Sequence, residues 1–277
     1  MYHAKCTMPI GYFKKIATQK RTVAVLFLLG SIFIAGVTYK REISRFVWKN
    51  SILDNIAYVL YPKDPSFLYE LGNHYFGNGG YDIDKAEFYF KETIKIASDY
   101  PKAHYQLARI NFINGDFGEA INEITKETDE KINKGVKFYM RGLIYGYAKF
   151  YDLAIEDFKK FTAYAPFDWA GWNDLSWIYF QKGDFKNAEL SAKEGLKREP
   201  SNPWLLNSLG IALLNQGKES ESEKFLRASL AGFESFSPKD WGMAYPGNNP
   251  DIYSEGLEKT IESIRHNLSL THVDSLK

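Results

Sequence analysis

The chain has 277 residues, and its 35 Lys and Arg residues nearly balance 34 Asp and Glu residues, giving a formal net charge of +1. This balance gives no support to a polyanionic partner, so we expect no nucleic-acid binding. The one cysteine, Cys6, excludes an internal disulfide bond and a thiolate metal cluster.

An apolar segment lies at residues 22–39, after a basic N-terminal segment at residues 1–21. It carries no charged residue and is flanked by Lys20-Arg21 and Lys40-Arg41. As a helix it would span about 27 Å, close to the thickness of the hydrocarbon core of a bilayer. We predict a transmembrane helix that contacts the lipid bilayer. A cleaved signal peptide and a buried helix are the alternatives.

Basic residues flank this apolar segment on both sides, with five before it and four soon after it. Because basic residues favour the cytoplasmic side, this difference favours an N-terminus inside and the rest of the chain outside. The sequence therefore predicts a single-pass membrane protein with its main domain on the periplasmic or extracytoplasmic side.

Residues 40–64 are expected to form a juxtamembrane helix, because apolar residues recur there at helical spacing. Ala57 and Pro62 stand where a repeat unit ending before residue 65 would place them. The helix would then cover the N-terminal face of the following domain. Alternatively, Trp48 and its basic neighbours favour a helix that lies on the lipid surface.

A period of 34 residues runs through the centre of the chain. Frames that begin at Pro101, Gly135, Trp169 and Pro203 align, and Gly-Asp-Phe recurs at residues 115–117 and 183–185. A fifth frame begins at Pro65. The predicted units are residues 65–100, 101–134, 135–168, 169–202 and 203–236.

The unit at residues 169–202 explains the period physically. Large apolar residues in "WNDLSWIYF" recur at spacings of three and four, which predicts a helix. Gly183 would allow a tight turn, and Asp184 could cap the next helix. Small residues at Ser176 and Ala188 would let the two helices approach closely. Because one such hairpin cannot bury its apolar faces alone, the units must stack.

The pattern resembles the tetratricopeptide repeat, a helix-turn-helix unit of 34 residues. The residues that carry the resemblance best are Trp172, Leu175, Ser176, Tyr179, Gly183, Phe185, Ala188 and Pro200. The resemblance implies an all-α solenoid of about five helical hairpins. It also implies a concave groove, lined by the first helix of each hairpin, that holds an extended peptide or a partner's helix.

Several residues depart from the repeat. Arg141 stands where an apolar residue is expected, which predicts a polar contact inside the third unit. Asn111 and Glu127 make the second unit irregular. The fifth unit has Ser222 in place of alanine and Glu234 in place of proline, as an end unit would.

Residues 237–277 are expected to end the array with a loop and a capping helix. Residues 237–253 are rich in Pro, Gly and Asn, which predicts a loop. In the following segment Leu257, Ile261, Ile264 and Leu268 form one apolar stripe, which is typical of a helix that closes a solenoid.

No arrangement of residues indicates catalysis, a metal or a cofactor. His74 and His104 lie in successive first helices, but no third ligand recurs at helical spacing. The glycine-rich residues 77–80 lack the preceding strand of a phosphate-binding loop. We therefore expect a protein that is not an enzyme.

The resemblance implies a protein-binding groove formed by residues of the first helices that lie off the packing stripe. They are Tyr69, Tyr105, Arg109, Phe112, Tyr139, Leu143, Tyr147, Asn173, Trp177, Phe180, Asn207 and Ile211. Aromatic residues and Arg are common in binding hot spots. Tyr69 stands where a chaperone-binding repeat protein would carry a Lys, which argues against a carboxylate clamp.

The expected function is a membrane-anchored scaffold or assembly factor that binds other proteins. One alternative is an exported or periplasmic binding module that remains after cleavage of the apolar segment. Another is an accessory subunit of an envelope enzyme or transport machine.

Overall fold

The computed structural model describes residues 64–77, 81–129, 132–244 and 249–271. The predicted transmembrane helix at residues 22–39 and almost all of the predicted juxtamembrane helix at residues 40–64 lie outside these ranges. Among the described helices, none is both long enough and apolar enough to cross a membrane.

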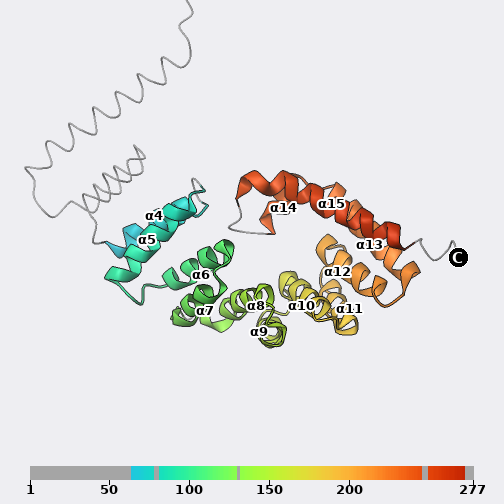
Figure 1. Cartoon of the computed structure of the whole chain (residues 1–277), viewed down its shortest axis with the longest axis horizontal. Coiled ribbons are helices and arrows are strands. Elements are labelled where there is room, and N and C mark those ends of the chain that lie inside the picture. The colour runs from blue at the N-terminus through green and yellow to red at the C-terminus, as the bar shows by residue number, and fades with distance from the viewer. Residues whose placement is uncertain (1–63, 78–80, 130–131, 245–248, 272–277) are drawn as a thin grey trace, which may run out of the picture.

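Helical hairpins follow one another along the described chain, where every regular element is a helix. Figure 1 shows a curved array with α6, α8, α10 and α12 on its inner side and α7, α9 and α11 on its outer side. The hairpins are α4 (Pro65–Tyr75) with α5 (Ile83–Ile96), α6 (Ala103–Asn114) with α7 (Phe117–Lys126), α8 (Lys137–Tyr147) with α9 (Tyr151–Tyr164), α10 (Trp169–Gln181) with α11 (Phe185–Leu196), and α12 (Pro203–Leu214) with α13 (Glu219–Glu234). The prediction of an all-α solenoid is confirmed for the described residues.

The same turn joins the two helices in four of these hairpins. Its backbone is left-handed at Gly115, Gly183 and Gly217, with φ between 71° and 82°. In the third hairpin Lys149 takes this conformation with φ 65°. A residue with a Cβ atom is strained there, so α8–α9 keeps the turn at an energetic cost. The predicted cap at Asp184 is confirmed, because its carboxylate accepts the backbone N–H of Asn187 at 3.1 Å.

Small side chains allow helices to approach closely, as predicted for Ser176 and Ala188. The Ser176 hydroxyl donates to the Ala188 carbonyl oxygen at 2.8 Å, within the α10–α11 hairpin. Between hairpins, Gly146 of α8 faces Ile178 of α10, and a Cβ atom on Gly146 would lie 2.3 Å from the Ile178 Cδ1 atom. Close packing therefore fixes how α8 and α10 sit side by side.

Arg141 forms the polar contact predicted inside the third unit. Its Nε and Nη2 atoms donate to the Asp157 carboxylate of α9 at 2.6 and 2.8 Å. The Asp157 side chain is 3% exposed, so the guanidinium group neutralises a buried charge. The hairpin keeps its geometry because both halves of the ion pair lie inside it.

Glu127 accounts for the irregular second unit. Its buried carboxylate accepts the backbone N–H groups of Lys102, Tyr105 and Asp129 at 3.3, 2.9 and 2.7 Å. These bonds connect the end of α7 to the beginning of α6. The chain then enters α8 through a π-helical turn, η2 (Ile132–Val136).

The predicted loop at residues 237–253 is wrong in part, because it contains α14 (Pro238–Met243) and a short 3-10 helix, η3 (Pro250–Ile252). The Ser237 hydroxyl accepts the backbone N–H of Asp240, and the Asp240 carboxylate accepts that of Ser237. This capping box offsets the cost of starting so short a helix.

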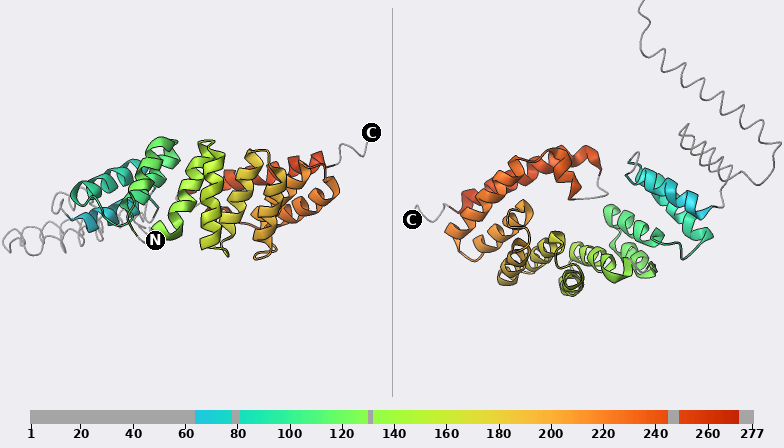
Figure 2. Two further views of the ribbon diagram at one scale, coloured as in Figure 1. Left: turned by 90° about the horizontal axis from the view of Figure 1, so that it is seen from below. Right: turned by 180° about the vertical axis from the view of Figure 1, so that it is seen from behind.

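The predicted closing helix is α15 (Tyr253–Leu270), which buries Leu257, Ile264 and Leu268. Its apolar side joins the core that holds Leu226 and Phe233 of α13. Both views in Figure 2 show α15 beside α13 at the C-terminal end of the array.

Candidate functional site

A groove with a volume of about 550 Å³ lies on the inner side of the array. Its walls come from α6, α8, α10 and α12, and Ala244 after α14 closes one edge. The lining residues are Tyr105, Arg109, Phe112, Ile113, Tyr139, Met140, Leu143, Tyr147, Trp169, Ala170, Asn173, Asp174, Ser176, Trp177, Phe180, Trp204, Asn207, Ser208, Ile211 and Ala244.

The structure brings together every predicted groove residue except Tyr69. The Tyr69 ring instead packs against Phe90 and Tyr100, with ring centroids 5.4 and 5.2 Å away. Tyr69 therefore lies outside this lining, because its side chain fills the contact between the first two hairpins. Sequence reasoning missed Trp169, Asp174, Trp204 and Ser208, which stand at the first, second and sixth places of the repeat frame.

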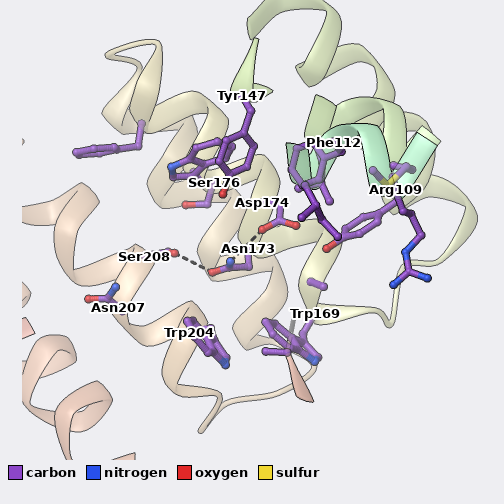
Figure 3. A pocket seen from close by; sticks show the side chains of 18 of the residues that line it. Arg109, Phe112, Tyr147, Trp169, Asn173, Asp174, Ser176, Trp204, Asn207 and Ser208 are labelled. Atoms are coloured by element: carbon purple, nitrogen blue, oxygen red, sulfur yellow. Dashed lines mark hydrogen bonds between the residues drawn. The ribbon is translucent and has the colours of Figure 1, made fainter. Parts of the chain in front are cut away.

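Two rows of aromatic side chains border the groove. In one row Tyr147 contacts Phe112 and Trp177, with centroid separations of 5.1 and 5.0 Å. In the other row Trp169 and Trp204 stack nearly parallel at 6.5 Å. Figure 3 shows Phe112 and Tyr147 on one side and the two tryptophans on the other. The Tyr147 side of the groove remains accessible, since this residue is 52% exposed.

A polar floor lies between these rows, as Figure 3 shows for Asn173, Asp174 and Ser208. The Ser208 hydroxyl donates to Asn173 Oδ1 at 2.8 Å, and Asn173 Nδ2 donates to Asp174 Oδ1 at 3.2 Å. The Tyr139 hydroxyl also hydrogen-bonds the Asp174 carboxylate. The floor therefore links α8, α10 and α12.

Asp174 is the acidic residue among those that line the groove. Burial raises the pKa of its carboxyl group to about 6, although the hydrogen bonds from Tyr139 and Asn173 oppose this shift. Burial also raises the pKa of Tyr139 well above its usual value, and the Asp174 charge adds to this effect. At neutral pH the floor therefore carries a carboxylate beside neutral phenol hydroxyl groups.

Arg109 is the basic residue of the lining, and it lies toward the N-terminal end of the groove. Its guanidinium group lies 4.5 Å from the centre of the Phe76 ring and donates to Gln106 Oε1 at 2.8 Å. Gln106 in turn donates to Asn73 Oδ1 at 2.7 Å. Burial lowers the pKa of Arg109, but an arginine remains charged at physiological pH.

His104 lies outside the groove lining, in a structural contact. Its Nδ1 atom is 2.7 Å from Glu123 Oε2, and its Nε2 atom is 2.8 Å from the Ser98 carbonyl oxygen. Among the described residues, no group of three or more His, Cys, Asp and Glu side chains could hold a metal ion. The candidate site is thus the groove, which is concave and combines aromatic walls with a few convergent polar groups.

Comparison with known proteins agrees with this geometry. The tetratricopeptide repeat family model matches residues 139–203, which run from α8 to the start of α12. The TPR repeat-containing protein YpiA of Bacillus subtilis (strain 168) is 27% identical over 212 residues, which cover 74% of this chain and 47% of YpiA. The chain thus spans about half the length of this relative.

Two solved structures are similar in fold. Residues 41 to the end of MamA from Desulfovibrio magneticus RS-1 give a TM-score of 0.56 at 17% identity, covering 62% of this chain and 97% of that one. YrrB, described as a TPR protein with an unusual peptide-binding site, gives a TM-score of 0.51 at 12% identity, covering 73% and 97%. At such identities the likeness shows the fold alone.

Proposed function

Because the family match, the relative and the shared fold all support a tetratricopeptide repeat protein, we propose that the chain binds an extended segment of a partner protein in its concave groove. The observation that carries this proposal is the lining, where aromatic rings from successive hairpins face one cavity. The chain would act as a scaffold or assembly factor without catalysis of its own.

The polar groups of the groove suit a polypeptide backbone. Asn207 Oδ1 is buried and accepts no hydrogen bond from the described residues. A buried acceptor without a donor costs about 1–3 kcal/mol, and a backbone N–H of a bound segment would remove this cost. The rings on either side would cover the apolar side chains of the same segment.

The proposal is tested with two matched variants of the full chain. Tyr147→Ala with Phe180→Ala truncates two rings of the groove, whereas Tyr164→Ala with Phe167→Ala truncates two rings outside it. The second pair is suitable as a control because Tyr164 and Phe167 are 54% and 81% exposed. Affinity for a partner identified by cross-linking in the native cell would be measured for both variants.

We expect the groove variant to lose at least about tenfold in affinity, since buried aromatic anchors each contribute about 2 kcal/mol or more. The control variant should bind as the unmodified chain does. Equal binding by the two variants would contradict the proposal, provided that circular dichroism shows the same helix content in both.

We further propose that residues 22–39 hold the chain in a membrane and keep the groove near its surface. The support comes from the sequence: an uncharged apolar segment flanked by basic pairs. The expected result is that the chain from native membranes resists extraction with alkaline carbonate and that its intact mass includes this segment. A mature chain that begins after residue 39 would contradict the anchor and favour an exported binding module.

A further inference from the structure

Several buried carboxylates outside the groove are paired with cations, whereas that of Glu127 is held by backbone N–H groups. Asp157 binds Arg141, and Glu123 lies 2.7 Å from His104 Nδ1 and 2.8 Å from the Lys126 ammonium group. These pairs follow the general rule that a buried charge requires a partner of opposite charge.

Glu189 follows the same rule between the last two hairpins. Its carboxylate binds the ammonium groups of Lys193 and Lys218, the latter at 2.7 Å. Burial alone would raise the pKa of Glu189, but hydrogen bonds from Lys193, Lys218 and Gln216 lower it to about 2. The array therefore supplies cations to the buried carboxylates of Asp157, Glu123 and Glu189.

Asp174 differs from these residues. Its hydrogen-bond donors, Tyr139 and Asn173, are neutral, and within the described part of the chain no Lys, Arg or His forms an ion pair with it. The remaining titratable groups that face it are Tyr147 and the exposed Asp168, whose charge is of the same sign. The carboxylate is thus partly buried, and none of the described residues supplies a counter-charge.

We propose that the bound segment supplies this counter-charge, through a Lys or Arg side chain that enters the groove and pairs with Asp174. This inference rests on the proposed function, because it names the chemistry of the partner at the same site. The charge of the floor and the charge of the incoming side chain are complementary.

The walls of the groove favour the same occupant. The aromatic side chains of Tyr147, Trp177 and Trp169 line the groove, and aromatic rings attract cations as well as the methylene groups of a Lys or Arg side chain. Arg109 would repel a second cation at the N-terminal end, so it fixes where the basic side chain can sit.

The experiment uses a phage-displayed library of random dodecapeptides, selected on the full chain in detergent micelles. Selections on Asp174→Asn and Asp168→Asn are run in parallel. Asp174→Asn keeps a side chain of the same shape but removes the charge. Asp168→Asn removes a nearby exposed charge and keeps a residue that caps α10, where Asp168 accepts the backbone N–H of Ala170 at 2.9 Å.

We expect the unmodified chain and Asp168→Asn to select peptides enriched in Lys or Arg, and Asp174→Asn to lose this enrichment. A synthetic peptide from the selection should lose at least about tenfold in affinity when its basic residue is replaced by norleucine. On Asp174→Asn the same replacement should have little effect.

Peptides without enrichment in basic residues, or equal enrichment on Asp174→Asn, would overturn the inference and leave the proposed function intact. If no selected peptide distinguishes the unmodified chain from the Tyr147→Ala, Phe180→Ala variant, the proposed function itself fails, and the inference fails with it. The two failures are therefore distinguishable.

A pH series gives a second, independent measurement. Protonation of Asp174 removes the negative charge, so the affinity for the basic peptide should fall about tenfold between pH 7 and pH 5. The norleucine peptide should bind equally at both values, because Tyr139 and Tyr147 stay neutral there and Asp168 is exposed. A parallel fall for both peptides would contradict the pairing with Asp174.

Discussion

The third and fourth hairpins, α8–α9 and α10–α11, reach the same geometry from different sequences. The third departs from the repeat at Arg141 and Lys149, whereas the fourth has Leu175 and Gly183 at the corresponding places. Arg141 is nevertheless paired with Asp157 inside the hairpin. In the fourth hairpin, which fits the repeat best, Asp174 forms no ion pair with any described residue.

This comparison teaches that departure from a repeat pattern is a poor guide to function in this chain. Arg141 is unusual for the repeat but has a structural role, because its guanidinium group pairs with Asp157 of the same hairpin. Asp174 breaks no rule of the repeat, yet it is the acidic residue of the groove lining to which no described residue supplies a counter-charge. Four predictions test this contrast, in order of expected effect.

The largest effect is expected from Arg141→Leu, which restores the apolar residue that the repeat favours. Because Asp157 would remain buried without its partner, the free energy of unfolding should fall by about 3–5 kcal/mol. Urea denaturation followed by circular dichroism measures this change. The double variant with Asp157→Leu should recover most of the loss, and a stable Arg141→Leu variant would show that the ion pair is dispensable.

Asp174→Asn should change the free energy of unfolding in the opposite direction and stabilise the protein. The raised pKa means that the charged carboxylate destabilises the folded state at neutral pH, so its removal should raise the free energy of unfolding. The shift from 3.8 to about 6 corresponds to at most about 3 kcal/mol, and solvent access through the open groove reduces this to roughly 1–2 kcal/mol. Urea denaturation at pH 7.5 checks this, and a loss of stability would indicate that Asp174 is a structural residue.

The pH dependence of stability should also distinguish Asp174 from the carboxylates that are paired with cations. Because the folded-state pKa of Asp174 lies above its unfolded value, the folded state binds the proton more tightly, and the contribution of Asp174 to stability should rise as pH falls from about 7 to about 4. The hydrogen bond with Glu123 raises the pKa of His104, whose contribution is lost as pH rises through that value and so has the same sign. Thermal melts across this range should show a smaller slope in Asp174→Asn than in the unmodified chain. Equal slopes would assign the dependence to other groups.

The smallest effect is expected from Lys149→Gly, which gives the third hairpin the turn residue of the fourth. A left-handed backbone costs a residue with a Cβ atom about 1 kcal/mol, but glycine also adds freedom to the unfolded chain. We therefore expect a gain of about 0.5 kcal/mol, measured by urea denaturation. Gly183→Lys is the matched reverse change and should cost about 1 kcal/mol. An unchanged stability in both variants would show that the turn tolerates either residue.

The fold was largely predictable because successive hairpins require similar residues at the same places of the repeat. Each hairpin needs a left-handed turn, a close helix contact and an apolar stripe, so residues such as Gly183 and Ser176 recur in phase. By contrast, α14 was read as a loop, since Pro238 and Gly242 are typical of turns. Its capping box spans only Ser237 and Asp240 and is too local to stand out among such residues.

The position of the groove could be predicted from the sequence, but the environment of its acidic residue, Asp174, could not. Helical periodicity indicates which side chains lie off the packing stripe, so it predicted that residues such as Tyr147 and Asn207 share one surface. It could not indicate that Asp174 lacks a counter-charge, because pairing depends on contacts between hairpins far apart in sequence. Tyr69 lies outside the lining for a similar reason, since its ring packs against Tyr100 between the first two hairpins.

The placement of α15 determines whether a further hairpin can stack on the C-terminal end of the array. By packing on α13, it occupies the surface on which another hairpin would otherwise stack. A second chain cannot extend the solenoid from this end without displacing Leu257, Ile264 and Leu268 from their buried positions. The apolar surface at the C-terminal end of the array is therefore covered by a helix of the same chain.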